Sequence, residues 1–100
     1  MRIRVSPQAQ SDINAIWLYV AQESGNTAGA TKLVRSITDK FTLFARFPFI
    51  GKSLEAHARR NVRFFPADPY LIFYSAASSE IRILRIIHGN RDVQSILAEE

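Results

Sequence analysis

Arginine side chains are concentrated in the second half of this chain, and they are the residues best suited to chemistry on an anion. Between positions 59 and 91 only Asp68 and Glu80 oppose six arginines: Arg59, Arg60, Arg63, Arg82, Arg85 and Arg91. A guanidinium makes forked hydrogen bonds to phosphate and carboxylate groups, so the cluster favours a polyanion or an acidic protein as partner. The formal charge of the whole chain, +4, favours the same partners and leaves direct nucleic-acid binding open.

A polar segment, His88 to Asp92, follows directly on the apolar run Ile81–His88. Loops at strand ends often carry function because a rigid sheet positions them. The target-binding candidates are therefore drawn from this segment and the arginine cluster: Arg59, Arg60, Arg63, Arg85, His88, Arg91 and Asp92.

Each of these candidates also has a structural interpretation. Strand alternation predicts that Arg85 shares a face with Ile83 and Ile87, where it is either a functional group or a paired, partly buried arginine. Gly89 and Asn90 are typical of a turn, in which case the polar residues after them are solvated or pair with each other.

Several kinds of chemistry are excluded or disfavoured. There is no cysteine, which rules out disulfides, thiolate nucleophiles and thiolate metal sites. His57 and His88 are the only histidines, and their surroundings do not match a metal-ligand pattern. No nucleophile elbow or phosphate-binding glycine loop is present. We expect no metal and no cofactor.

Aromatic residues are spaced for packing more than for base stacking. Most of them fall on predicted apolar helix stripes and are expected in the core. Phe47 and Phe49 flank Pro48 beyond the second predicted helix, where they could line an apolar groove. Trp17, Phe47 and Phe49 are the candidates for that groove.

The elements that must position these residues are readable from periodicity and caps. Met1–Val5 alternates as a strand, and Ser6-Pro7 is typical of the start of a helix that continues to Glu23. A second helix, capped by Thr27, is predicted to end before Pro48. Three strands follow, at Asn61–Phe65, Tyr70–Ser75 and Ile81–His88.

The pattern predicts one α+β domain over residues 1–100, with a helical hairpin packed on a twisted antiparallel sheet. The longest apolar runs are much shorter than the roughly 18 residues of a membrane span. We therefore expect a cytoplasmic protein without a membrane anchor.

The order and spacing of these motifs resemble the RelE/ParE toxins of bacteria. The resemblance covers nearly the whole chain and is most specific in the Tyr70–Tyr74 strand and in the last strand with its His88-Gly89-Asn90-Arg91-Asp92 ending. It implies a β-α-α-β-β-β fold and a cognate antitoxin, ParD-like or related, that wraps a helix or extended segment over the hairpin and sheet.

The resemblance implies one of two activities. RelE-like members cleave messenger RNA on the ribosome with basic residues and a C-terminal Tyr or His. Here Leu71 occupies the position of a RelE arginine and the C-terminal tyrosine is replaced near Leu97, although Arg91 matches a basic catalytic position. ParE-like members inhibit DNA gyrase by binding. We predict the gyrase-binding activity, with no catalytic residues; a ribosome-dependent endoribonuclease and an inactive antitoxin-binding relative are the alternatives.

Overall fold

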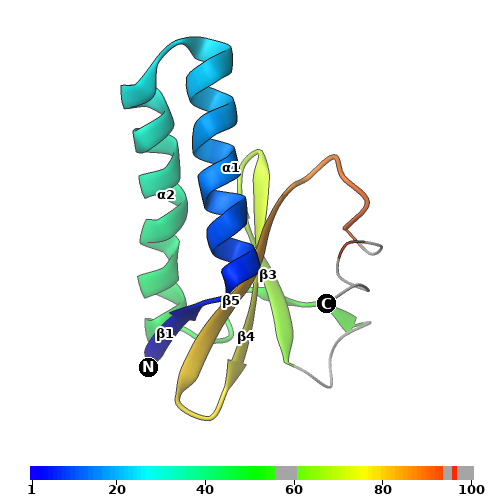
Figure 1. Cartoon of the computed structure of the whole chain (residues 1–100). Coiled ribbons are helices and arrows are strands. Elements are labelled where there is room, and N and C mark those ends of the chain that lie inside the picture. The colour runs from blue at the N-terminus through cyan, green and yellow to red at the C-terminus, as the bar shows by residue number, and fades with distance from the viewer. Residues whose placement is uncertain (56–60, 94–95, 97–100) are drawn as a thin grey trace.

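The computed structural model describes residues 1–55, 61–93 and 96. Within them the chain forms, in order, β1 (Arg2–Val5), α1 (Pro7–Ser24), α2 (Thr27–Arg46), β2 (Lys52–Ser53), β3 (Val62–Ala67), β4 (Tyr70–Ala77) and β5 (Glu80–His88). The two helices lie side by side against one face of a single sheet (Figure 1). The predicted α+β class and helical hairpin are confirmed, and the short strand β2 is an addition to the prediction.

The sheet is mixed, with strand order β1-β5-β4-β3-β2. The pairs β2–β3, β3–β4 and β4–β5 are antiparallel, while β1 pairs parallel with β5. The expectation of a wholly antiparallel sheet is therefore wrong for one pair. The reason is the connection, because a long crossover that contains both helices can return the chain to the sheet in the parallel sense.

Both helices begin at polar caps. Ser6 caps α1, with its Oγ accepting a hydrogen bond from the Ala9 N–H at 3.0 Å, as predicted. The cap of α2 is Asn26, whose Oδ1 accepts from the Gly29 N–H at 2.9 Å, so the predicted Thr27 is the first helical residue instead. Gly25 ends α1 with a φ of 65°, a conformation that a glycine adopts at little cost.

The main core lies between the hairpin and the sheet. Helix residues such as Ile13, Ile37 and Phe44 pack there against Ile72, Ile83 and other strand residues. A second, smaller cluster covers the opposite face, where Phe73 and Ile87 are buried against Leu71, Val93 and Ile96. We call this opposite side the outer face. The chain after β5 thus returns over the outer face of the sheet (Figure 1).

A β-bulge interrupts the pairing of β4 with β5. Phe73 pairs with Arg85, but the next residue, Tyr74, pairs with Ile83, so Leu84 is the extra residue. The bulge reverses the alternation of β5: Ile83 and Ile86 belong to the main core, whereas Leu84 and Ile87 pack on the outer face. The prediction that Arg85 shares a face with both Ile83 and Ile87 is wrong for this reason.

Candidate functional site

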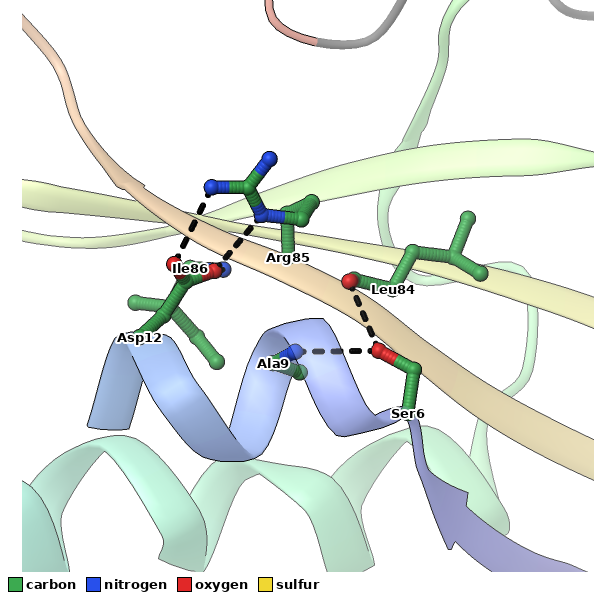
Figure 2. Close-up of polar contacts among 6 residues, drawn as sticks. All are labelled: Ser6, Ala9, Asp12, Leu84, Arg85 and Ile86. Atoms are coloured by element: carbon green, nitrogen blue, oxygen red, sulfur yellow. Dashed lines mark hydrogen bonds and ion pairs between the residues drawn. The ribbon is translucent and has the colours of Figure 1, made fainter. Parts of the chain in front are cut away.

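Arg85, a predicted target-binding residue, is held by a carboxylate of the first helix (Figure 2). Its Nε donates to one carboxylate oxygen of Asp12 at 2.8 Å, and a terminal nitrogen donates to the other at 3.0 Å. The side chains of Arg85 and Asp12 are only 18% and 16% exposed. Of the two interpretations of Arg85, the structure therefore shows a paired, partly buried arginine.

The same carboxylate also completes the main-chain pairing of β5. Strand β1 ends at Val5, which pairs with Ile83, so β5 continues beyond its neighbour. There the Ser6 hydroxyl donates to the Leu84 carbonyl at 2.9 Å, and Asp12 accepts from the Ile86 N–H at 2.9 Å (Figure 2). Two side chains at the start of α1 thus take the place of a neighbouring strand beside the bulge.

His88 and Arg91, two other predicted residues, line a pocket at the far end of β5. The pocket has a volume of about 600 Å³ and lies between α1, α2, the β3–β4 turn and the segment after β5. The wall of the pocket is mostly apolar. Its polar groups come from two tyrosines, Tyr19 and Tyr70, and from the residues at and after the end of β5. The lining residues are Ala15, Ile16, Tyr19, Val20, Leu33, Pro69, Tyr70, His88, Asn90 and Arg91.

Local hydrogen bonds fix the geometry of the pocket's polar side. The Gly89 N–H donates to the Pro69 carbonyl at 2.9 Å, which ties the segment after β5 to the β3–β4 turn. His88 accepts from the Asn90 N–H at its Nδ1, 3.2 Å away, and its ring lies edge-on to Tyr70. Burial raises the pKa of Tyr70, and the neighbouring Tyr19 raises it further. Tyr70 therefore remains a neutral hydroxyl over the physiological pH range.

Phe47 and Phe49 lie in the loop between α2 and β2, residues 47–51, which we call the α2–β2 loop. It contains a turn in which the Ile50 N–H donates to the Phe47 carbonyl at 3.0 Å. The hydroxyl of Tyr74 donates to the Pro48 carbonyl at 2.9 Å and accepts from the Gly51 N–H at 2.8 Å. The tyrosine ring is itself stacked on Phe44, with 4.1 Å between ring centroids. The loop is thus attached to the core at two points.

Gly51 is required at its position by close packing. A Cβ atom there would lie 2.7 Å from the Tyr74 ring and hydroxyl and 2.9 Å from the Phe64 carbonyl. Arg63, another predicted target-binding residue, donates to the Gly51 carbonyl at 2.8 Å and places its guanidinium 4.8 Å from the centre of the Phe49 ring. Arg63, a residue of β3, therefore contacts the α2–β2 loop and does not line the pocket.

The remaining predicted residues are spread over the molecule. Trp17 is half-buried, and its indole N–H donates to Thr31 at 3.0 Å, near the start of α2. Since a helix rises about 1.5 Å per residue, Thr31 and Phe47 are about 24 Å apart along α2, so a groove that contained both Trp17 and Phe47 would run along most of the hairpin. Asp92 is exposed, whereas Arg59, Arg60 and Leu97 lie outside the described residues.

Three residues that shape the site were missed by the sequence analysis: Asp12, Tyr70 and Tyr74. Asp12 did carry a signal, because it interrupts the apolar stripe of α1 formed by Ala9, Ile13 and Ile16. A carboxylate on a buried helix face requires a partner. Tyr74 gave no comparable signal, since its hydroxyl reaches a loop 23 residues earlier in the chain.

Leu71 is the residue on which the choice between RNA cleavage and gyrase binding rested in the sequence. It packs on the outer face of the sheet. It is partly buried against the cluster that contains Phe73 and Ile87. An apolar side chain cannot stabilise the charge that develops on a phosphate during cleavage.

Among the described residues there is no group of three or more His, Asp or Glu side chains that could hold a metal ion. Nor is any helix in that part of the chain long and apolar enough to cross a membrane.

Comparison with known proteins identifies the family and supports the fold. Residues 3–93 match a family model described as the ParE toxin of the type II toxin–antitoxin system parDE. A solved structure of a chromosomal ParDE toxin–antitoxin system from P. aeruginosa superposes with a TM-score of 0.74 at 22% identity, covering 88% of this chain and 95% of that one. No curated protein sequence matches the chain. Because the family model covers most of the sequence, the chain belongs to the ParE toxin family of type II toxin–antitoxin systems.

Proposed function

We propose that this toxin acts by binding DNA gyrase in the bacterial cytoplasm and that a cognate, ParD-like antitoxin neutralises it. Membership of the ParE family supports DNA gyrase as the target. The pairing of Arg85 with Asp12 supports binding over RNA cleavage, since two of the guanidinium's hydrogen bonds are spent on a carboxylate within the chain. Phosphoryl-transfer chemistry needs several positioned cationic groups. The position of the RelE arginine is filled here by the apolar Leu71, so one more such group is missing.

The target-binding residues that we propose from the described part of the chain lie at or near the molecular surface. His88 and Arg91 line the pocket, Arg63 lies beside the α2–β2 loop, and Asp92 is exposed next to Arg91. Arg85 is proposed as a positioning residue, because its guanidinium holds α1 against β5. Arg59 and Arg60 stay in the proposal on the strength of the sequence alone.

The antitoxin's contact is proposed at the pocket between the hairpin and the end of β5. Apolar walls from Ile16, Val20 and Leu33 would accept the apolar face of an inserted segment, while Arg91 and His88 at the polar side would meet its carboxylates. An acidic amphipathic segment has both properties. Trp17 lies on the same hairpin and is proposed as an outer contact of that segment.

Supercoiling by purified gyrase, measured with and without the toxin, tests the proposal. The toxin should block supercoiling, and one equivalent of antitoxin should restore it. Cleavage of messenger RNA by the same preparation on translating ribosomes, with gyrase unaffected, would instead favour the RelE-like activity.

A further inference from the structure

The α2–β2 loop presents apolar side chains to solvent from a rigid support. Phe49 is 70% exposed, Phe47 53% and Ile50 43%, although all three belong to one short turn. The Tyr74 hydroxyl makes two hydrogen bonds to the main chain of this turn, and Arg63 donates two more, to the Phe49 and Gly51 carbonyls. The attachment explains why the loop keeps its shape; it does not explain why large apolar residues occupy its tip.

Cations surround these apolar rings. The Arg46 guanidinium lies 5.7 Å from the centre of the Phe47 ring, and that of Arg63 lies 4.8 Å from the centre of the Phe49 ring. Lys52 follows the loop directly and is exposed. An apolar centre with a charged rim is the pattern of a protein-binding surface, and the sign of this rim requires acidic groups on the partner.

The loop is separate from the pocket proposed for the antitoxin. Leu33 lines the pocket, and Phe47 follows the end of the same helix, so the two lie about 21 Å apart along α2 at about 1.5 Å per residue. A rigid loop loses little conformational freedom on binding, which suits a contact that must form with an already folded surface. A disordered antitoxin segment can adapt to its partner and has less need of such a support.

We infer that the α2–β2 loop is the docking element for the toxin's target, inserting Phe49 into an apolar socket on an acidic protein surface. The inference rests on the proposed function and narrows it: this loop becomes the contact of the target, and the pocket, with His88 and Arg91, becomes the contact of the antitoxin. It moves Phe47 and Phe49 from the predicted antitoxin groove to the target interface.

The test uses four variants. Each is purified for measurements in vitro, and each is also expressed in bacteria without antitoxin to measure growth arrest. Phe49→Ser removes the apolar tip, and Leu18→Ser is its control because Leu18 is also an exposed apolar residue, 52% exposed, on α1. Arg46→Glu reverses the charge of one rim residue. Arg35→Glu is its control, because Arg35 is an exposed arginine of α2 away from the loop. Thermal midpoints establish that all four remain folded, and binding to the antitoxin is measured by calorimetry.

Phe49→Ser and Arg46→Glu should each lose growth arrest and weaken inhibition of purified gyrase by about tenfold or more, while they bind antitoxin as the wild type does. The two control variants should arrest growth normally. Growth arrest by Phe49→Ser at wild-type strength would overturn the inference and leave the proposed function standing. Loss of antitoxin binding by that variant would place the antitoxin on the loop, which also overturns it.

Failure of the proposed target gives a different result. If the wild-type chain arrests growth without inhibiting gyrase, gyrase is excluded, yet loss of arrest in Phe49→Ser still supports the loop as the docking element. A wild-type chain that does not arrest growth at all would overturn both proposals.

Discussion

The carboxylate of Asp12 accepts two hydrogen bonds from the guanidinium of Arg85, at 2.8 and 3.0 Å, and a third from the main-chain N–H of Ile86. One residue of α1 thereby binds both the side chain and the backbone of β5, immediately beside the β-bulge. Together with the Ser6 hydroxyl, which donates to the Leu84 carbonyl, this pair fixes the position of α1 along the strand.

Asp12→Asn should lower the free energy of unfolding by about 2 kcal/mol, between the values typical of exposed and of fully buried ion pairs. The amide keeps the shape but removes the charge that compensates Arg85. Glu80→Gln is the matched control, because Glu80 pairs at 3.4 and 3.7 Å with two exposed arginines and should cost less than about 1 kcal/mol. Urea denaturation of both variants measures the difference. Equal losses would show that the Asp12 pair contributes no more than a surface contact.

Replacing Arg85 tests its assignment as a positioning residue. Asp12→Ala, Arg85→Ala and the double variant form a cycle in which the coupling energy should be about 1 kcal/mol or more. A double variant in which the two losses simply add would remove the evidence for coupling. If Arg85→Gln abolished gyrase inhibition without loss of stability, Arg85 would be a target contact after all.

Tyr74→Phe should destabilise the protein by about 1–3 kcal/mol, because it leaves the buried Gly51 N–H and the Pro48 carbonyl without their shared partner. The phenylalanine ring retains the stacking on Phe44. Hydrogen exchange at Gly51 should accelerate more than exchange at residues of β4. A uniform increase across the sheet would instead indicate a general loss of packing.

Alkaline pH should also reduce stability through the tyrosines. Burial raises the pKa of Tyr74 above its ordinary value of 10.0, although the Gly51 hydrogen bond and Arg63 partly oppose the shift, and the pKa of Tyr70 is raised as well. Above pH 10 the unfolded chain releases these protons while the folded chain retains them, so the free energy of unfolding falls as pH rises. Tyr74→Phe should show a shallower fall in denaturation curves recorded from pH 9 upward. An unchanged slope would contradict this linkage.

Arg91→Ala should weaken antitoxin binding by about three- to tenfold, because an exposed cation at an apolar pocket contributes roughly 1 kcal/mol toward an acidic partner. The loss should be greatest at low ionic strength. Arg35→Ala is the control, since Arg35 is an exposed arginine of α2 outside the pocket lining. Titration calorimetry at two salt concentrations measures both effects. Equal affinities for the two variants would argue against the pocket as the antitoxin's contact.

Local signals in the sequence predicted the elements of the fold well. Ser6 and Pro7 place the start of α1 correctly, and the Tyr, Phe and Ile content of Tyr70–Ser75 identifies β4. The parallel pairing of β1 with β5 was missed, since it depends on the path of the whole chain. The bulge was missed because a single extra residue in β5 changes the face of everything that follows, without any change in composition.

Prediction of the site was weaker for the same physical reason. The arginine cluster indicated the kind of partner, but Arg63 and Arg85 are each held by contacts that cross the fold. Phe47 and Phe49 stood out in the sequence because they lie beyond a helix end and flank a proline. Their rigid support could not be predicted, since it comes from the Tyr74 hydroxyl on a strand distant in sequence.

Inhibition of purified DNA gyrase by this toxin, titrated over a range of toxin concentrations and repeated with one equivalent of antitoxin, tests the account most directly. Ribosome-dependent cleavage of messenger RNA is measured on the same preparation. The account predicts dose-dependent loss of supercoiling, recovery with antitoxin and intact messenger RNA. Cleaved messenger RNA with undiminished supercoiling would contradict it.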